Sequence, residues 1–143
     1  MTERPTHDVV RLRIPLKSEY LSVLRATAAA IAGSMDFNYD EVIQIRIAVS
    51  EVFDMALEHT GRVGSSEDVI DLPIEFVIGE DILEFQISYP VQRTEELDRE
   101  QNEETHAILH SLMDTVDFSV DDAIVHMTKR RSNNDSAENS QIE

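Results

Sequence analysis

The sequence contains no cysteine and only four glycines and four prolines among its 143 residues. The absence of cysteine excludes a disulfide framework, thiolate zinc sites and cysteine nucleophiles. No apolar run reaches the length of about eighteen residues that a membrane-spanning helix needs, so we expect no membrane span. Residues 1–8, MTERPTHD, lack the apolar stretch of a signal peptide, which predicts a cytoplasmic protein.

Basic residues are also scarce. Twelve Lys and Arg face 29 Asp and Glu, which gives a formal net charge of -17. So acidic a surface repels the phosphate backbone, and we therefore expect no direct nucleic-acid partner and favour a basic partner or another protein surface. A hydrophobic content of 41% is normal for a folded domain and excludes disorder throughout.

The spacing of apolar residues predicts eight elements in the order β-α-α-β-β-α-β-β. Gly79-Glu80-Asp81 is typical of a hairpin turn, and Pro73 indicates an edge position or a bulge. The predicted elements are strands at 9–14, 69–78, 82–89, about 116–120 and 123–129, and helices that begin at Ser18, at about 39 and at 104, the last after an exposed loop or weak helix over 91–104.

The helix over about 39–59 is the strongest signal, because it is apolar over most of its circumference. Asn38 or Asp40 can cap its beginning, and Gly61 can close its end. Its polar positions lie seven residues apart and share one face, with Met55 beside them. These positions are Gln44, Glu51 and Glu58.

Helices packed on one face of a mixed, mostly antiparallel sheet define the fold class as α+β, a two-layer sandwich of three helices on a sheet. We expect one domain over residues 9–130, a flexible N-terminus at 1–8 and a disordered polar tail at 131–143. The strand VVRLRI at 9–14 is a candidate sheet edge.

The stretch IRIAVSEVFDMALEH at 45–59, taken with this element order, resembles the RsbW-type anti-sigma factor serine kinases. These are GHKL ATPases with the Bergerat fold. The resemblance covers about residues 9–130 and is best from Ile14 to His59. It implies a transcription regulator of the stress response that sequesters an RNA polymerase sigma factor, is countered by an STAS-type anti-sigma antagonist and forms a homodimer. In relatives the fold binds ATP and magnesium.

The family's nucleotide motifs are altered in this sequence. Relatives carry a glutamate near the γ-phosphate, an asparagine four residues later that holds magnesium, and often a histidine four beyond. Glu51 and His59 match, but Met55 stands at the asparagine position. Magnesium requires hard oxygen ligands, which a thioether cannot replace. The family aspartate that receives the adenine amino group falls on Tyr89 or Pro90.

The glycine-rich phosphate turn of relatives corresponds to NEETHAIL at 102–109, where Glu103 and Glu104 stand about where glycines should be. We therefore expect no bound cofactor, no metal and no catalysis, with Glu51 a vestigial base and with vestigial binding positions at Met55, His59 and Tyr89. An active ATP-dependent kinase that phosphorylates a serine of the antagonist, with Glu51 as base, is the alternative. A sensor that binds a different small molecule in this pocket is another.

The candidate partner surface is the first helix together with the loop before the second. Its residues are Lys17, Tyr20, Ser22 and Arg25. Arg25 stands at the position that resembles a partner-contacting arginine of the family. Its alternative is a surface ion pair with Glu19 or another carboxylate.

Two further patterns have a plain and a functional interpretation. His106 and His110 are spaced for a helical zinc pair and could join Glu103, although such pairs are common by chance. The acidic stretch 95–104 is either a solubilising surface or an attraction for a basic sigma-factor surface.

Overall fold

A computed structural model describes residues 7–63, 70–88, 95–119 and 123–132, with the side chains of 59–63 and 95–102 outside the description. Most of the predicted flexible segments 1–8 and 131–143 lies outside the described residues. The elements are β1 (Asp8–Pro15), the 3-10 turn η1 (Ser18–Tyr20), α1 (Leu21–Ser34), α2 (Tyr39–Val63), β2 (Asp71–Ile78), β3 (Ile82–Ser88), α3 (Glu95–Leu112), β4 (Thr115–Ser119) and β5 (Ile124–Arg130). The predicted element order is confirmed.

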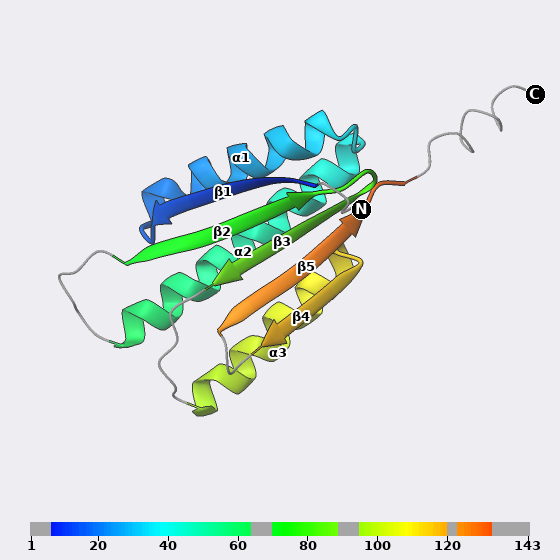
Figure 1. Ribbon diagram of the computed structural model, residues 1–143. Coiled ribbons are helices and arrows are strands. Elements are labelled where there is room, and N and C mark those ends of the chain that lie inside the picture. Colours follow the sequence, from blue (N-terminus) through cyan, green and yellow to red (C-terminus); the bar gives the residue numbers. More distant parts are fainter. Residues whose placement is uncertain (1–6, 64–69, 89–94, 120–122, 133–143) are drawn as a thin grey trace, which may run out of the picture.

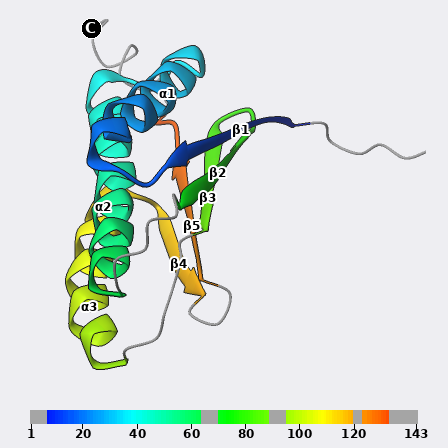
Figure 2. The ribbon, with the colours of Figure 1, turned by 90° about the vertical axis from the view of Figure 1, so that its left-hand side faces the viewer.

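The five strands form one sheet in the order β1-β2-β3-β5-β4, and every described strand pair is antiparallel. β1 is an edge strand, as its sequence predicts. Figures 1 and 2 show the three helices on one face of the sheet, with α2 between α1 and α3. The predicted α+β two-layer sandwich is confirmed.

The core lies between the two layers. Alternate residues of β2, β3 and β5 point toward the helices and are almost fully buried, as the period of two requires. The rings of Phe76 on β2 and Phe85 on β3 meet edge to face, with centroids 5.5 Å apart. From α2, Ile45, Val49 and Val52 are fully buried against them. Burial of each such side chain contributes about 1.5–3 kcal/mol, so the core holds α2 firmly on the sheet.

The turn between α1 and α2 contains the C-terminal cap of α1 and the N-terminal cap of α2. The backbone of Asp36 takes a left-handed conformation, and the N–H groups of Asp36 and Phe37 donate to Gly33 and Ala32, which is a Schellman ending. Asn38 then caps α2, because its Oδ1 accepts the Glu41 N–H at 2.8 Å while Glu41 Oε1 accepts the Asn38 N–H at 2.9 Å.

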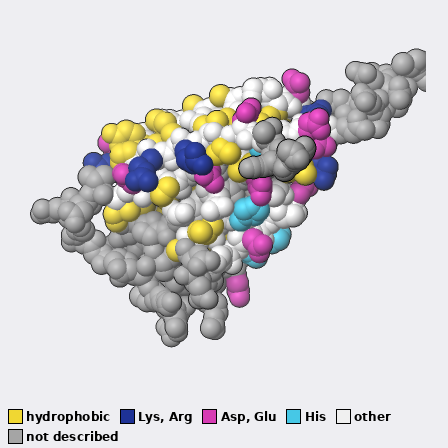
Figure 3. Space-filling model, in the orientation of Figure 1, with side chains coloured by type: hydrophobic (Ala, Val, Ile, Leu, Met, Phe, Trp, Pro, Cys, Tyr) yellow, Lys and Arg dark blue, Asp and Glu magenta, His cyan; other side chains and the backbone are white. Residues whose placement is uncertain are grey.

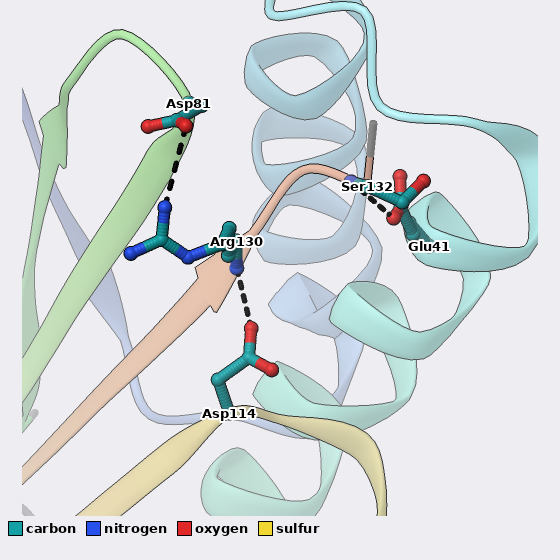
Figure 4. A network of polar contacts seen from close by, with 5 residues as sticks. All are labelled: Glu41, Asp81, Asp114, Arg130 and Ser132. Carbon is teal, nitrogen blue, oxygen red and sulfur yellow. Dashed lines mark hydrogen bonds and ion pairs between the residues drawn. The ribbon is translucent and has the colours of Figure 1, made fainter. Parts of the chain in front are cut away.

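A network of polar contacts, the clamp, fixes the end of β5 beside this turn (Figure 4). Glu41 Oε2 accepts the Ser132 N–H at 2.9 Å, and Asp114 Oδ2 accepts the Arg130 N–H at 2.5 Å. The Arg130 guanidinium donates to Asp81 in the β2–β3 turn at 3.3 Å. The clamp therefore joins α2, the hairpin turn, the start of β4 and the end of β5.

Several predicted bounds of helices, and the predicted edge position of β2, differ from the structure. α1 begins at Leu21, because residues 18–20 form a 3-10 turn and Ser18 is not its cap. α2 continues past Gly61 to Val63. α3 begins at Glu95, so of the two interpretations of 91–104 the helix is correct from Glu95 onward, and residues 91–94 lie outside the described residues. β2 is an internal strand without a bulge in its described register, but Pro73 lies one residue beyond its pairing with β3.

Candidate functional site

A cleft of about 540 Å³, here called the α2–α3 cleft, opens between the second and third helices. On α2 its residues recur at helical spacing, so they share one face. Glu104 and Thr105 of α3 lie across from them. The described lining comprises Glu51, Asp54, Met55, Leu57, Glu58, Glu104, Thr105 and Ile108; among these described residues four are carboxylates and none is a Lys or Arg.

The carboxylates of the cleft repel one another. Burial raises the pKa of Glu51 above its ordinary value, and the charges of Asp54 and Glu104 raise it further. Burial also raises the pKa of Asp54, where the positive charge of Arg25 acts in the opposite direction and Glu58 adds to the rise. The cleft is therefore a region of negative potential that a cationic group would relieve.

Met55 forms an apolar part of the cleft. It is 2% exposed and belongs to the hydrophobic core, so its side chain reaches inward from the helix rather than into solvent. Its sulfur is a soft, weak acceptor, and the carboxylates of Glu51 and Asp54 lie on the same rim. The cleft thus combines an apolar wall with an acidic rim.

Of the positions expected to be vestigial, the structure brings Glu51 and Met55 together in the cleft. The side chain of His59 and the whole of Tyr89 lie outside the described residues. Asp54, adjacent in sequence to Met55, also lines the cleft. Its importance follows from the i, i+3 spacing to Glu51, a signal that the sequence contains.

Of the predicted partner residues, Arg25 lies on the α1–α2 contact. Its Nε donates to Ser50 Oγ at 3.0 Å, and Ser50 Oγ donates to the Arg46 carbonyl at 2.7 Å. The described contact of Arg25 is therefore a hydroxyl of α2 and not Glu19. Lys17 and Ser22 are exposed and Tyr20 is half-buried, so this end of α1 presents them beside one another.

A buried lysine on β5 is a contact that sequence reasoning missed. Lys129 Nζ donates to Gln44 Oε1 and to the Leu112 carbonyl, each at 2.6 Å. These bonds join the sheet to α2 and α3 near the end of α3. Gln44 therefore belongs to a structural contact, although it shares the polar stripe with Glu51.

The histidine pair of α3 packs as an aromatic cluster. The rings of His106 and His110 are 4.6 Å apart between centroids, and His106 lies 4.7 Å from the Phe118 ring of β4. Burial lowers the pKa of His106, and His110 lowers it further. Among the described residues no group of three His, Cys, Asp or Glu is arranged to hold a metal, so Glu103 does not complete a zinc site.

Fold and cleft together define the class: an α+β sandwich with one antiparallel sheet and a cleft between its second and third helices. Within the described residues, no helix is both long and apolar enough to cross a membrane. No family model matches the chain.

Comparison with curated proteins finds relatives that match part of this chain. The chain is 32% identical over 83 residues to the serine-protein kinase RsbW of Bacillus pumilus, covering 58% of this chain and 51% of the relative. It is 33% identical to RsbW of Bacillus cereus over 81 residues (57% and 48%) and 34% identical to RsbW of Listeria monocytogenes over 82 residues (57% and 50%). The chain is thus similar to these RsbW proteins over more than half of its length, and the resemblance seen in the sequence is confirmed. It spans about half the length of these relatives.

Proposed function

We propose that this protein is a regulator of the anti-sigma factor type that acts by binding alone. It sequesters an RNA polymerase sigma factor and is released by an STAS-type antagonist, and its nucleotide motifs have degenerated. The relationship to RsbW supports the regulatory class. The loss of kinase chemistry is argued from the α2–α3 cleft.

The observation that carries the proposal is the acidic lining of this cleft. Of the lining residues that the structure describes, four are carboxylates and none is a Lys or Arg. At about 6 Å and an effective dielectric near 20, each carboxylate opposes each phosphate charge by roughly 3 kcal/mol. The described lining therefore does not fit a magnesium–triphosphate complex, and no catalytic step is assigned to Glu51.

The position of Met55 supports the same conclusion. Magnesium takes near-octahedral oxygen coordination, which a thioether does not offer. Because Met55 is 2% exposed and part of the core, a small movement of its side chain would not open a metal site. The residue serves the packing of α2, which is consistent with a scaffold kept for recognition.

The partner surface that we propose is formed by η1 and the beginning of α1. It contains the exposed Lys17 and Ser22 and the half-buried Tyr20 and Arg25. Charges at such positions affect association rate and selectivity more than affinity. We also propose that two copies pair, with the free edge of β1 as the candidate contact, since an unpaired edge strand is a template for another strand.

Calorimetry with ATP and magnesium tests the proposal directly, with the B. pumilus relative as the positive control. We expect no measurable heat up to millimolar ATP and no phosphate transfer to an STAS-domain antagonist. A sigma factor should be captured by the chain without nucleotide. Micromolar ATP affinity with transfer abolished by Glu51→Gln would overturn the proposal and establish the active kinase.

A sensor function remains the second candidate, favoured by the open volume of the cleft. A small molecule that raises the melting temperature in a thermal-shift screen, and whose effect Met55→Leu or Glu51→Gln alters, would support it. Sigma-factor capture that is independent of any such ligand would argue for binding alone.

A further inference from the structure

The outer surface of α2 carries a continuous ridge with two chemical halves, here called the α2 ridge. Tyr39, Ile43 and Ile47 follow one another at i, i+4 and i+8, and acidic residues continue the same line at Glu51 and Asp54. Tyr39 is 77% exposed and Ile47 is 42% exposed. Two of the four exposed large apolar side chains among the described residues lie on this ridge.

Small side chains of α1 flank the apolar half of the ridge, and the exposed Arg46 of α2 lies next to Ile47. The bond from Arg25 to Ser50 sets the register of α1 against α2, so the next turn of α1, at Ala29, lies beside the turn that carries Ile47. Ala26, Ala30 and Gly33 of α1 are exposed, and a Cβ added at Gly33 meets nothing within 4 Å. The surface beside the ridge is therefore low enough for another helix to approach.

We propose that the α2 ridge binds an amphipathic helix of a partner protein whose contact face is apolar at one end and rich in Lys and Arg at the other. Apolar side chains would cover Ile43 and Ile47, and cations would lie over Asp54 and the acidic rim of the α2–α3 cleft, including Glu104 of α3. The proposal rests on the proposed function, since it names the chemistry of a protein partner.

The length and the charge of the α2 ridge both favour a basic helix as its partner. Positions 39 to 58 span about 28 Å at 1.5 Å per residue, which is the length of a helix of about twenty residues. Cations placed over the acidic half would offset the mutual repulsion of Glu51, Asp54 and Glu104.

A second copy of this chain does not provide that complement. Two ridges paired antiparallel would press carboxylates against Ile47 of the other copy, and two paired parallel would oppose carboxylate to carboxylate. An anionic surface is repelled by the same residues. The basic amphipathic helix is the occupant that satisfies both halves.

The test uses the full chain and a labelled helical peptide of twenty residues, with Leu on one face in its first half and four Lys on that face in its second. Fluorescence anisotropy gives the affinity. We expect Ile47→Ser to weaken binding about fivefold and Asp54→Lys about tenfold, the latter mainly through slower association. A peptide with Glu in place of Lys should bind at least tenfold more weakly.

Two matched controls lie elsewhere on the molecule. Val9→Ser removes a side chain of similar exposure, 39%, from β1, and Glu80→Lys reverses an exposed acid in the β2–β3 turn. Both should bind the peptide within twofold of the unchanged chain. Circular dichroism melts establish that each variant folds.

Several results would overturn the proposal. One is a peptide that binds the Ile47→Ser and Asp54→Lys variants as well as it binds the unchanged chain. A second is that the control variants weaken binding as much as these two variants do. A third is a peptide that fails to bind the unchanged chain. Sedimentation in which Ile47→Ser alone splits a dimer would assign the ridge to a second copy. The titrations are repeated with ATP and magnesium. Calorimetric ATP binding would refute the proposed function, whereas absent peptide binding without ATP affinity would refute this inference alone.

Discussion

Carboxylates at the beginning and in the middle of α2 have opposite surroundings. At the clamp, Glu41 is only 8% exposed, and each of its oxygens accepts a backbone N–H, while Asp114 accepts another (Figure 4). In the cleft, burial and like charges raise the pKa of Glu51 and Asp54, and among described residues neither has a hydrogen-bond or ion-pair partner. Neighbours, and not residue type, decide whether a carboxylate stabilises the fold.

On the helix-free face of the sheet, acidic side chains also have favourable neighbours. Figure 3 shows Lys and Arg interspersed with Asp and Glu across this face. Arg11 pairs with Glu75 at 2.8 Å, and His126 lies 2.7 Å from Glu84. Acids on this face have basic neighbours. In the described part of the cleft, the charges of Asp54 and Glu104 raise the pKa of Glu51, while the charge of Arg25 opposes the rise at Asp54. The negative potential around Glu51 is therefore less balanced than that of the sheet face.

The largest effect should come from changing the cleft wall. Met55→Asn restores the family asparagine but buries an amide in a core position that is 2% exposed. We expect the free energy of unfolding to fall by about 2–4 kcal/mol, from lost apolar burial and an unsatisfied polar group. Met55→Leu should cost under about 1.5 kcal/mol. Urea unfolding measures both, and an Asn variant as stable as the Leu variant would mean that the wall is not packed.

The second-largest loss of stability should come from a substitution in the clamp. Glu41→Ala removes the acceptor for the N–H groups of Asn38 and Ser132, so we expect unfolding free energy to fall by about 1–3 kcal/mol. The neighbouring Asp40 is exposed in the same first turn, and Asp40→Ala should change stability by no more than about 0.5 kcal/mol. Equal losses in the two variants, measured by urea unfolding, would show that the clamp contributes nothing specific.

Most of the fold could be predicted because its signals are local. The alternation in VVRLRI marks β1, and Gly79-Glu80-Asp81 marks the hairpin. The beginning of α2 was predictable for the same reason, since Asn38 and Glu41 form a capping box within four residues. The end of α2 was not, because a glycine is compatible with a continuing helix as well as with a helix end.

The site could be predicted only in part, because it depends on contacts between distant segments. Glu51 and Met55 share a face by helical spacing alone, but Glu104 joins them only through the packing of α3. The bond between Arg25 and Ser50 likewise joins residues 25 apart. No local pattern gives the register of α1 against α2, so a surface ion pair for Arg25 was the natural expectation.

The smallest expected effect is a pH-dependent change in stability at Glu51, and its direction follows from the raised pKa. Because the pKa of Glu51 is raised in the folded protein, the folded state holds its proton to higher pH than the unfolded state. Ionisation of Glu51 therefore costs no stability at acidic pH, where the carboxyl is protonated in both states. The cost develops as the pH rises above the pKa of the unfolded state. Glu51→Gln should raise unfolding free energy at pH 7 by about 0.5 kcal/mol, allowing for solvent screening, and by nothing near pH 3.

Glu75→Gln, on the sheet face, should instead lower stability at pH 7 by up to about 1 kcal/mol, since it breaks the pair with Arg11. Urea unfolding of both variants at pH 3 and pH 7 compares the two regions directly. If Glu51→Gln destabilised the protein at pH 7, the Glu51 carboxylate would have a favourable partner. The cleft would then be balanced like the sheet face, and the electrostatic argument against a bound triphosphate would lose its main support.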